Sequence, residues 1–169
     1  MKLNEIVKSI SSQLKLSQVK TSGKYTVYGA SGECGYIDSF KINKNYLALV
    51  KDGAGVGRVF KLNATDSFLG TMQGLVPNDN VDRDYIYYLL RYLDLGSDFN
   101  GATIPHIYFK NYGNETVKEV DYSQQILIAK ELAKIEENIC NKNKHLLFLN
   151  ELVKSRFIRQ EVVAWDMIF

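Results

Sequence analysis

Residues 126–156 read ILIAKELAKIEENICNKNKHLLFLNELVKSR, and the spacing of the apolar side chains in this stretch decides the fold of the C-terminal part of the chain. These side chains recur at alternating steps of four and three residues, which is the heptad pattern of a helix that packs against another helix. Ser123 precedes the pattern and is a suitable N-cap. We therefore expect one helix over residues 123–160, with a seam formed by Ile128, Leu132, Ile135, Ile139, Lys142, Leu146, Leu149, Val153 and Arg156.

A helix over residues 123–160 would hold 38 residues and extend about 57 Å, at a rise of about 1.5 Å per residue. A domain of about 120 residues has a radius of gyration of only about 14 Å, so such a helix cannot lie wholly on it. The helix either folds back on its own domain or pairs with another chain. Pairing is favoured, because the aliphatic seam residues, each worth about 1.5–3 kcal/mol when buried, would otherwise face water.

The seam therefore predicts a partner helix from another chain, and a homodimer is one way to supply it. If that chain is a second copy, the two-fold pair is isologous, and we expect helices of this placement to run antiparallel. If the seam is centred, its midpoint is Lys142, so that two like charges meet there. The expected interface consists of Ile128, Leu132, Ile135, Ile139, Lys142, Leu146, Leu149 and Val153.

Glycine and proline are confined to the part of the chain that precedes this helix. All 12 glycines lie between Gly23 and Gly113, and both prolines lie in the same stretch. Short apolar segments there alternate with Gly, Ser, Asn and Asp turns, which is typical of compact, mostly antiparallel β structure. The expected strands are Tyr25–Tyr28, Tyr36–Phe40, Tyr46–Val50, Val56–Leu62 and Phe68–Val76.

Two further helices are expected beside the strands. A short amphipathic helix is indicated at the N-terminus by Leu3, Ile6, Val7, Ile10 and Leu14. A second helix begins at Asp82 and is closed by Gly96, after which residues 97–122 return to turns and short strands. The expected fold class is α+β. It comprises a β-rich domain with short helices over residues 1–122, a long coiled-coil-type helix over 123–160 and a C-terminal tail over 161–169.

The composition excludes several classes of protein. The 169-residue chain is 46% hydrophobic and 24% charged, which excludes a disordered chain, and its net charge of +2 is not that of a strongly basic nucleic-acid binder. Cys34 and Cys140 lie far apart and, with His106 and His145, show no zinc-ligand spacing, so we expect no metal site and two reduced thiols. The apolar runs are too short to cross a membrane, and we expect a cytoplasmic protein.

Residues 52–57, DGAGVG, follow the apolar run Tyr46–Val50, as the loop of a dinucleotide or S-adenosylmethionine site would. Such a loop must open into a helix whose N-terminus faces the ligand, whereas this one opens into RVFKL, which alternates like a strand. The pattern therefore favours a tight connection between two antiparallel strands. The sequence also lacks the motifs of a P-loop, of a common acidic nuclease and of an amino-methyltransferase, so we expect neither a cofactor nor a catalytic centre.

Basic side chains are concentrated in the first part of the chain. Residues 1–61 hold 10 basic and 4 acidic side chains, whereas residues 62–122 hold 4 basic and 9 acidic ones. Lysines and an arginine lie among tyrosines in the basic part, which indicates either a face that follows a phosphate backbone or an ordinary solvated surface. Residues 100–106, NGATIPH, are rich in hydrogen-bonding side chains and indicate either a base-reading loop or a structural turn.

The order and spacing of several short motifs resemble those of target recognition domains in the specificity subunits of type I restriction–modification enzymes. The motifs are YTVYGASG (25–32), GYID (35–38), LVKDG (49–53), GRV (57–59), G-x-T-x-P-H-I (101–107) and QQI (124–126), which leads into the heptad helix. The sequence departs from the family in having no proline in residues 117–122, which lead into the helix, and no Trp-and-Gly opening near the N-terminus.

The resemblance implies a non-catalytic DNA reader that docks on a modification (methyltransferase) subunit and, through it, on the restriction subunit. Because members usually carry two recognition domains and two helices, it also implies a half-subunit, two copies of which would read the halves of a split site. The residues expected at double-stranded DNA are Lys24, Lys51 and Arg58 at phosphates and Ser31, Thr103 and His106 at base edges. The alternatives are a helix-dimerised interaction or regulatory module that does not bind DNA and an S-adenosylmethionine-dependent enzyme.

Overall fold

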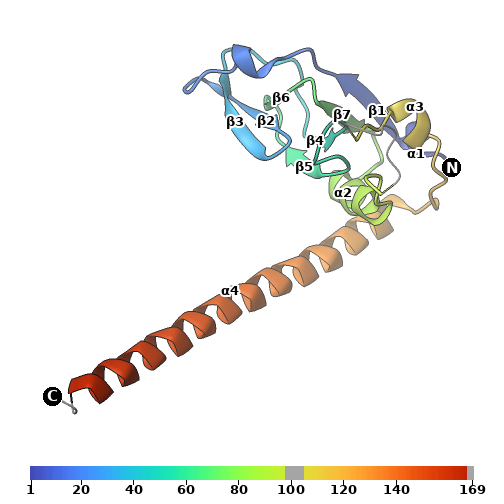
Figure 1. Cartoon of the computed structure of the whole chain (residues 1–169). Helices are drawn as coiled ribbons and strands as arrows, with labels where there is room; N and C mark the ends of the chain where they lie inside the picture. Colours follow the sequence, from blue (N-terminus) through green and yellow to red (C-terminus); the bar gives the residue numbers. More distant parts are fainter. Residues whose placement is uncertain (98–104, 167–169) are drawn as a thin grey trace. The chain divides into compact units, whose positions relative to one another are not determined.

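A computed structural model describes the backbone of residues 1–97 and 105–166, and the side chains as far as Phe157 (Figure 1). The chain divides into two compact units, Met1–Ala129 and Lys130–Phe169. The first unit holds the strands, the short helices and the first turns of the last helix, and the second unit contains the rest of that helix. The α+β fold class, with a β-rich domain and a long C-terminal helix, is confirmed.

A four-stranded antiparallel sheet forms the centre of the first unit, with its strands in the order β1-β7-β4-β5. These strands are β1 (Val7–Ser11), β7 (Met72–Pro77), β4 (Tyr46–Val50) and β5 (Val59–Leu62). Strand β4 pairs with β5 on one side and β7 on the other, and all five of its side chains are buried. A continuous apolar run of this length is typical of a strand that is covered on both faces.

The two faces of β4 belong to different hydrophobic clusters, because successive side chains of a strand point to opposite faces. Leu47 and Leu49 belong to a cluster that includes the buried side chains of helix α2 (Arg83–Tyr92). Ala48, between them, belongs to a second cluster that includes Phe68. The sheet is therefore covered by helices on one face and by a second sheet on the other.

The second sheet has the strand order β3-β2-β6. Strands β2 (Tyr25–Gly29) and β3 (Gly32–Ile37) are antiparallel, and β6 (Ser67–Phe68) runs parallel to β2. Phe68 meets the four-stranded sheet at Gly74 of β7, where an added Cβ would lie 2.7 Å from the phenyl ring. Glycine at this position lets the two layers approach each other.

The prediction of an amphipathic helix at the N-terminus is correct only for its first turn. Helix α1 spans only Leu3–Ile6, and the following residues form β1, which pairs antiparallel with β7. Val7 and Ile10 are β-branched, and the backbone hydrogen bonds that β7 offers outweigh a weak helical periodicity. Tertiary pairing therefore decides the structure of this segment.

The strand predictions differ from the structure mainly at their ends. Tyr46–Val50 is confirmed to the residue. The prediction of Tyr36–Phe40 is wrong for most of its length, because β3 ends at Ile37. The expected strand Phe68–Val76 is two strands, because a turn separates β6 from β7. Strand β5 begins three residues later than expected, since residues 56–58 belong to the preceding loop.

Helix α2 begins as the sequence predicts, and Asp82 is its N-cap. The Asp82 carboxylate accepts a hydrogen bond from the N–H of Tyr85 at 2.7 Å. The helix ends at Tyr92, four residues before Gly96. In residues 105–122 the structure has helix α3 (Phe109–Tyr112) where turns and short strands were expected, and a short 3-10 helix η1 (Leu16–Gln18) follows β1.

Helix α4 spans Tyr122–Asp166 and holds 45 residues, which confirms the long C-terminal helix. It begins one residue earlier than expected, so Ser123 lies inside its first turn and is not its N-cap. It continues past Gln160, so most of the expected tail over 161–169 is helical. Gln125, in the first turns, is buried and ties α4 to α2, because its Oε1 accepts the N–H of Asp82 at 2.9 Å.

Candidate nucleic-acid interface

The loop between β4 and β5, residues 51–58, is a tight connection between antiparallel strands, as its sequence predicts. Gly53 and Gly57 have φ values of +89° and +85°, a region that glycine adopts without steric cost. The Gly57 N–H donates to the Val50 carbonyl at 2.9 Å, and the Val50 N–H donates to the Arg58 carbonyl at 2.8 Å. The loop therefore returns into a strand, and it lacks the helix N-terminus that would hold a cofactor phosphate.

Two segments that are distant from this loop in the sequence contact it. Nη1 of Arg58 donates a hydrogen bond to the carbonyl of Ala30, in the β2–β3 turn, at 2.8 Å. On the other side of the loop, the Ile107 N–H donates to the Lys51 carbonyl at 3.0 Å, and residues 105–107 run antiparallel beside it. The β2–β3 turn, the β4–β5 loop and residues 105–107 thus form one surface, which we call the three-loop surface.

Four of the six residues expected to contact DNA lie on the three-loop surface. Ser31 is exposed in the β2–β3 turn and Arg58 is exposed in the loop that faces it. Lys51 and His106 are partly buried where residues 105–107 meet the loop. The fold thus brings the cationic side chains of Lys51 and Arg58 to the same surface as the short polar side chain of Ser31, with His106 beside them.

The other two expected residues lie elsewhere. Lys24 is exposed just before β2, at the end of that strand opposite the β2–β3 turn, and its Nζ lies 5.3 Å from the ring centre of Tyr25. Lys24 is therefore not part of the three-loop surface. Thr103 lies outside the described residues.

His106 is held from two sides. Its Nδ1 is hydrogen-bonded to Oδ1 of Asp52, and its ring meets that of Tyr108 edge to face, with the ring centres 3.9 Å apart. The other ring nitrogen, Nε2, is buried and has no hydrogen-bond partner within the described part of the chain. The imidazole is thus fixed inside the surface, and its two nitrogens do not point into solvent.

Sequence reasoning missed two residues next to this surface, Tyr108 and Lys110. The Tyr108 side chain is 47% exposed, and Nζ of Lys110 lies 5.1 Å from the centre of its ring. The available signal was an aromatic residue followed two positions later by a lysine, directly after the Pro-His turn. Because tyrosines are frequent throughout this domain, the signal did not distinguish this one.

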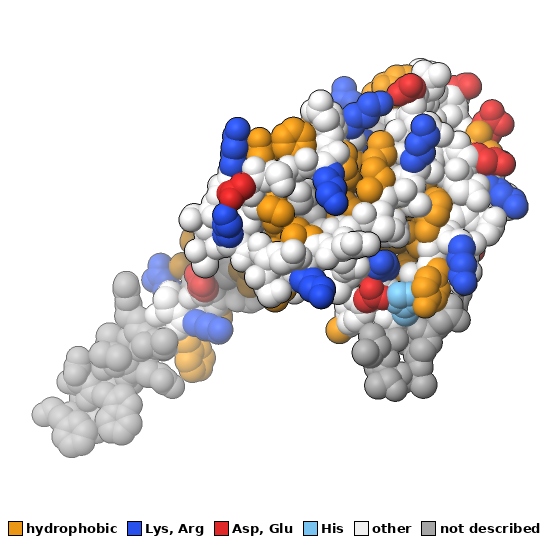
Figure 2. All heavy atoms as spheres, turned by 90° about the horizontal axis from the view of Figure 1, so that it is seen from above, with side chains coloured by type: hydrophobic (Ala, Val, Ile, Leu, Met, Phe, Trp, Pro, Cys, Tyr) orange, Lys and Arg blue, Asp and Glu red, His pale blue; other side chains and the backbone are white. Residues whose placement is uncertain are grey.

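Positive charge is present at the three-loop surface without dominating it. Lys51 and Arg58 contribute cations, whereas the Asp52 carboxylate is bonded to His106. Figure 2 shows one face of the molecule, on which Lys and Arg side chains are spread among uncharged and hydrophobic ones and are not gathered in one patch. Individual phosphate contacts are therefore better supported than a strong, general attraction for polyanions.

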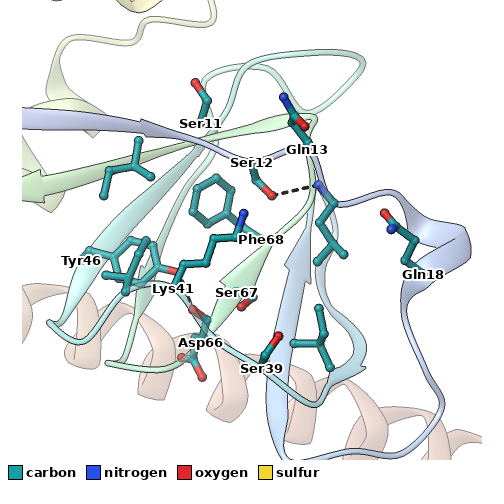
Figure 3. A pocket seen from close by; sticks show the side chains of 14 residues that line it. Ser11, Ser12, Gln13, Gln18, Ser39, Lys41, Tyr46, Asp66, Ser67 and Phe68 are labelled. Carbon is teal, nitrogen blue, oxygen red and sulfur yellow. Dashed lines mark hydrogen bonds between the residues drawn. The ribbon is translucent and has the colours of Figure 1, made fainter.

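A separate hollow of about 280 Å³ lies at the end of β3 that is opposite the β2–β3 turn (Figure 3). Tyr46 and Phe68 are among its apolar lining residues, and serine and glutamine side chains, Lys41 and Asp66 supply its polar groups. Part of this lining stabilises the fold, because the Tyr46 hydroxyl donates to the Asp66 carbonyl at 2.6 Å. Of the residues expected to contact DNA, none of the five that the structure describes lines this hollow.

Two observations concern nucleophiles and metal ligands among the described residues. Burial raises the pKa of the Cys34 thiol, which keeps it protonated and a poor nucleophile. Within the described ranges, no three His, Cys, Asp or Glu side chains are grouped so that they could hold a metal ion. None of the described helices is long and apolar enough to span a membrane.

Comparison with known proteins gives a consistent result. The family model of the type I restriction modification DNA specificity domain matches residues 1–151. The S subunit of a type I restriction–modification system from M. genitalium is similar in structure, with a TM-score of 0.67 and 19% identity over 83% of this chain and 39% of that chain. The HsdS subunit from Thermoanaerobacter tengcongensis has a TM-score of 0.62 and 19% identity over 83% of this chain and 37% of that one.

A third structure comes from work on complex assembly and conformational transition of the type I R-M system. It has a TM-score of 0.64 and 18% identity over 82% of this chain and 38% of that one. The chain thus spans less than two-fifths of each of these structures. No curated protein matches the sequence.

The family match extends through the whole β-rich unit and most of α4, and the solved structures share the fold. The resemblance drawn from the order of short motifs is thereby confirmed. The chain belongs to the family of type I restriction–modification DNA specificity domains.

Proposed function

We propose that the chain is a non-catalytic DNA-recognition module that reads duplex DNA through the three-loop surface and pairs with a second copy through α4. The observation that carries the proposal is the convergence of Ser31, Lys51, Arg58 and His106 from three separate segments, in a member of a DNA specificity family. Cationic side chains position a protein on the phosphates, while short polar side chains read base edges. Lys24 is then a peripheral phosphate contact, and Thr103 a base contact beyond the described residues.

The proposed assembly includes a modification subunit and, through it, a restriction subunit. Specificity subunits are generally non-catalytic, so methyl transfer and cleavage require partner subunits, and we expect no cofactor on this chain. One of the similar structures comes from work on the assembly of such a system. In this arrangement residues 1–122 read the DNA and the helix beyond them connects the reader to its partners.

The exposure of α4 supports the proposed pairing. Every side chain from Lys130 to Phe157 is exposed, although the seam is aliphatic. Ile139 and Leu149, for example, are 56% and 53% exposed. A row of exposed aliphatic side chains, interrupted at Lys142, indicates a surface that a partner covers, and heptad spacing selects a helix as that partner. A second copy supplies an identical helix, and a two-fold axis perpendicular to α4 makes the proposed pair antiparallel.

Selection from a library of duplexes with a randomised centre, carried out with the modification subunit present, tests the DNA role. We expect enrichment of a sequence whose two halves are inverted repeats. If about six phosphates are contacted, log affinity falls against log salt with a slope of about −5. Failure to enrich any sequence, or an affinity that does not depend on salt, would contradict the proposal.

Spin labels on α4 test the antiparallel pairing. A single label at Ser155→Cys, with Cys34 and Cys140 replaced by serine, lies 13 residues from the proposed midpoint at Lys142. In a centred antiparallel pair the two labels are about 39 Å apart along the axis, whereas in a parallel pair they lie at the same level. A distance below about 20 Å would contradict the antiparallel arrangement.

Lys142 tests the register of that pair. If two Lys142 side chains meet at the two-fold axis, Lys142→Leu removes a like-charge contact and strengthens dimerisation. Light scattering over a dilution series measures the change. An unchanged dimer would place the midpoint elsewhere along the seam.

One observation favours the alternative of an interaction module that does not bind DNA. Leu147 and Phe148 lie on the face of α4 opposite the seam, and they are 65% and 64% exposed. A helix with apolar side chains on both faces can contact more than one protein partner. A chain that dimerises but enriches no duplex in the library selection would support this alternative.

A further inference from the structure

The segment after Pro105 was expected to contact DNA through His106, but the hydrogen bonds of this side chain argue otherwise. A carboxylate only accepts hydrogen bonds, so Nδ1 of His106 donates its hydrogen bond to Asp52. Nε2 is buried. One nitrogen is therefore occupied and the other is inaccessible to a base edge.

The neighbouring Tyr108 has the opposite properties. Its side chain is 47% exposed, and its ring packs against the imidazole of His106, 3.9 Å away between centres. The His106 ring cannot turn away without losing the bond to Asp52. The hydrogen bond from His106 to Asp52 and the edge-to-face contact of His106 with Tyr108 thus hold an exposed aromatic side chain in one place.

The backbone at Tyr108 is fixed on both sides. Before it, Ile107 is buried and its N–H donates to the Lys51 carbonyl at 3.0 Å. After it, helix α3 begins, and the Tyr108 carbonyl accepts the N–H of Asn111 at 2.9 Å. An exposed tyrosine on a fixed backbone loses little conformational entropy when it binds a partner, which is a property of residues that dominate interfaces.

We propose that Tyr108 is a specificity-determining residue that contacts DNA bases, that Asp52 and His106 are its positioning residues, and that Lys110 contacts an adjacent phosphate. This inference rests on the proposed DNA-reading function. The phenol offers a ring face for a base or a thymine methyl group, and a hydroxyl that donates to or accepts from a base edge. Lys110, close to the same ring, supplies the cation that a phosphate beside that base requires.

The test uses two probes, the duplex enriched in the library selection and the unselected pool of duplexes. We expect Tyr108→Ala to lower the ratio of the two affinities at least tenfold and to leave the salt slope unchanged, because the contact is not ionic. Lys110→Gln should weaken both duplexes equally and reduce the slope by about 0.9, as the loss of one phosphate contact does. The matched control is Tyr122→Ala at the start of α4, where the tyrosine is 50% exposed, and it should change neither quantity.

The positioning role of Asp52 has a separate signature. Asp52→Ala should lower the affinity ratio about as much as Tyr108→Ala, and the double variant should be no worse than either, because both act on one contact. Asp52→Asn retains an oxygen that accepts from His106 Nδ1 and should restore most of the ratio. A merely structural loss would add to that of Tyr108→Ala and would not be rescued.

The outcomes separate this inference from the function on which it rests. Selection by the wild-type chain with an unchanged ratio for Tyr108→Ala, verified as folded by its thermal transition, would overturn the role of Tyr108 alone. Absence of any selection by the wild-type chain would overturn the DNA-reading function and the inference with it. Loss of selectivity in Tyr108→Ala but not in Tyr108→Phe would assign the contact to the ring, and loss in both would assign it to the hydroxyl.

Discussion

Strand β4 and the exposed part of α4 are both rich in aliphatic side chains, yet they differ completely in burial. All five side chains of Tyr46–Val50 are buried, whereas every side chain over residues 130–157 is exposed. The strand is covered by two other layers of its own unit. Similar apolar content can therefore stabilise a domain from within or remain exposed for a partner to cover.

The spacing of the apolar residues separates these two cases. In a strand with no polar residue, side chains on both faces must be buried. The first unit buries both faces of β4 against other layers. A heptad row needs cover on one face of a helix, and a second helix supplies it. Substitutions in β4 should therefore change folding, and substitutions in the seam should change assembly.

The largest expected effect is the loss of pairing in Ile139→Asp. Each copy would place one carboxylate in the apolar seam, and burial of an unpaired charge is strongly unfavourable. We expect dimerisation to weaken at least a thousandfold, or about 4 kcal/mol, measured by light scattering over a dilution series. Asn141→Asp adds the same charge on the opposite face of α4 and should leave the dimer intact, so equal effects of the two variants would contradict a seam at Ile139.

A smaller effect is expected from truncating the same residue type in the two regions. Leu47→Ala opens a cavity in the core and should lower the free energy of unfolding by about 2–5 kcal/mol. Leu149→Ala should change the unfolding of the monomer by less than about 0.5 kcal/mol and weaken the dimer instead. Urea unfolding followed by tyrosine fluorescence, at concentrations below those of dimerisation, measures both. A large loss of monomer stability in Leu149→Ala would remove the distinction.

The smallest expected effect is a loss of stability at alkaline pH that is confined to the first unit. Partial burial, together with the hydrogen bond to Glu33, raises the pKa of Tyr28 to about 12, above the ordinary value near 10. Its stabilising contribution is therefore complete below pH 10 and disappears as the pH rises through about 12. No tyrosine follows Tyr122 in the sequence, so the pairing of α4 should not respond through this group.

Urea unfolding between pH 9 and 11.5 measures this alkaline loss, and Tyr28→Phe is the matched variant. The phenylalanine keeps the ring but cannot ionise, so its stability should fall less steeply over this range. Equal slopes for the two proteins would show that Tyr28 does not contribute.

Much of the fold follows from features that act over short distances in the chain. The run Tyr46–Val50 predicts a buried strand, and Asp82 predicts the start of α2, because apolar continuity and N-capping depend on neighbouring residues. The prediction of a longer N-terminal helix is wrong because Val7 and Ile10 pair with β7, about 65 residues away in the sequence. The helix propensity of a segment does not include the energy that it gains by pairing with a strand distant in the sequence.

The candidate site shows the same division. Ser31, Lys51, Arg58 and His106 are indicated by residue type and by family resemblance, and the fold brings them to one surface. Lys24 has the same residue type as Lys51, yet it lies at the other end of β2. The roles of His106 and Tyr108 depend on the direction of one imidazole ring, which no spacing reveals.

The long helix and its mostly aliphatic seam follow from the order of residues, because a heptad is a repeat along one chain and needs only local geometry. The three-loop surface exists only in the folded chain. That surface depends on contacts between residues 28 positions apart, Arg58 and Ala30, and 54 positions apart, His106 and Asp52. Contacts between residues so distant in the sequence depend on the packing of the whole unit, because the energy of packing must offset the entropy lost in closing the intervening chain.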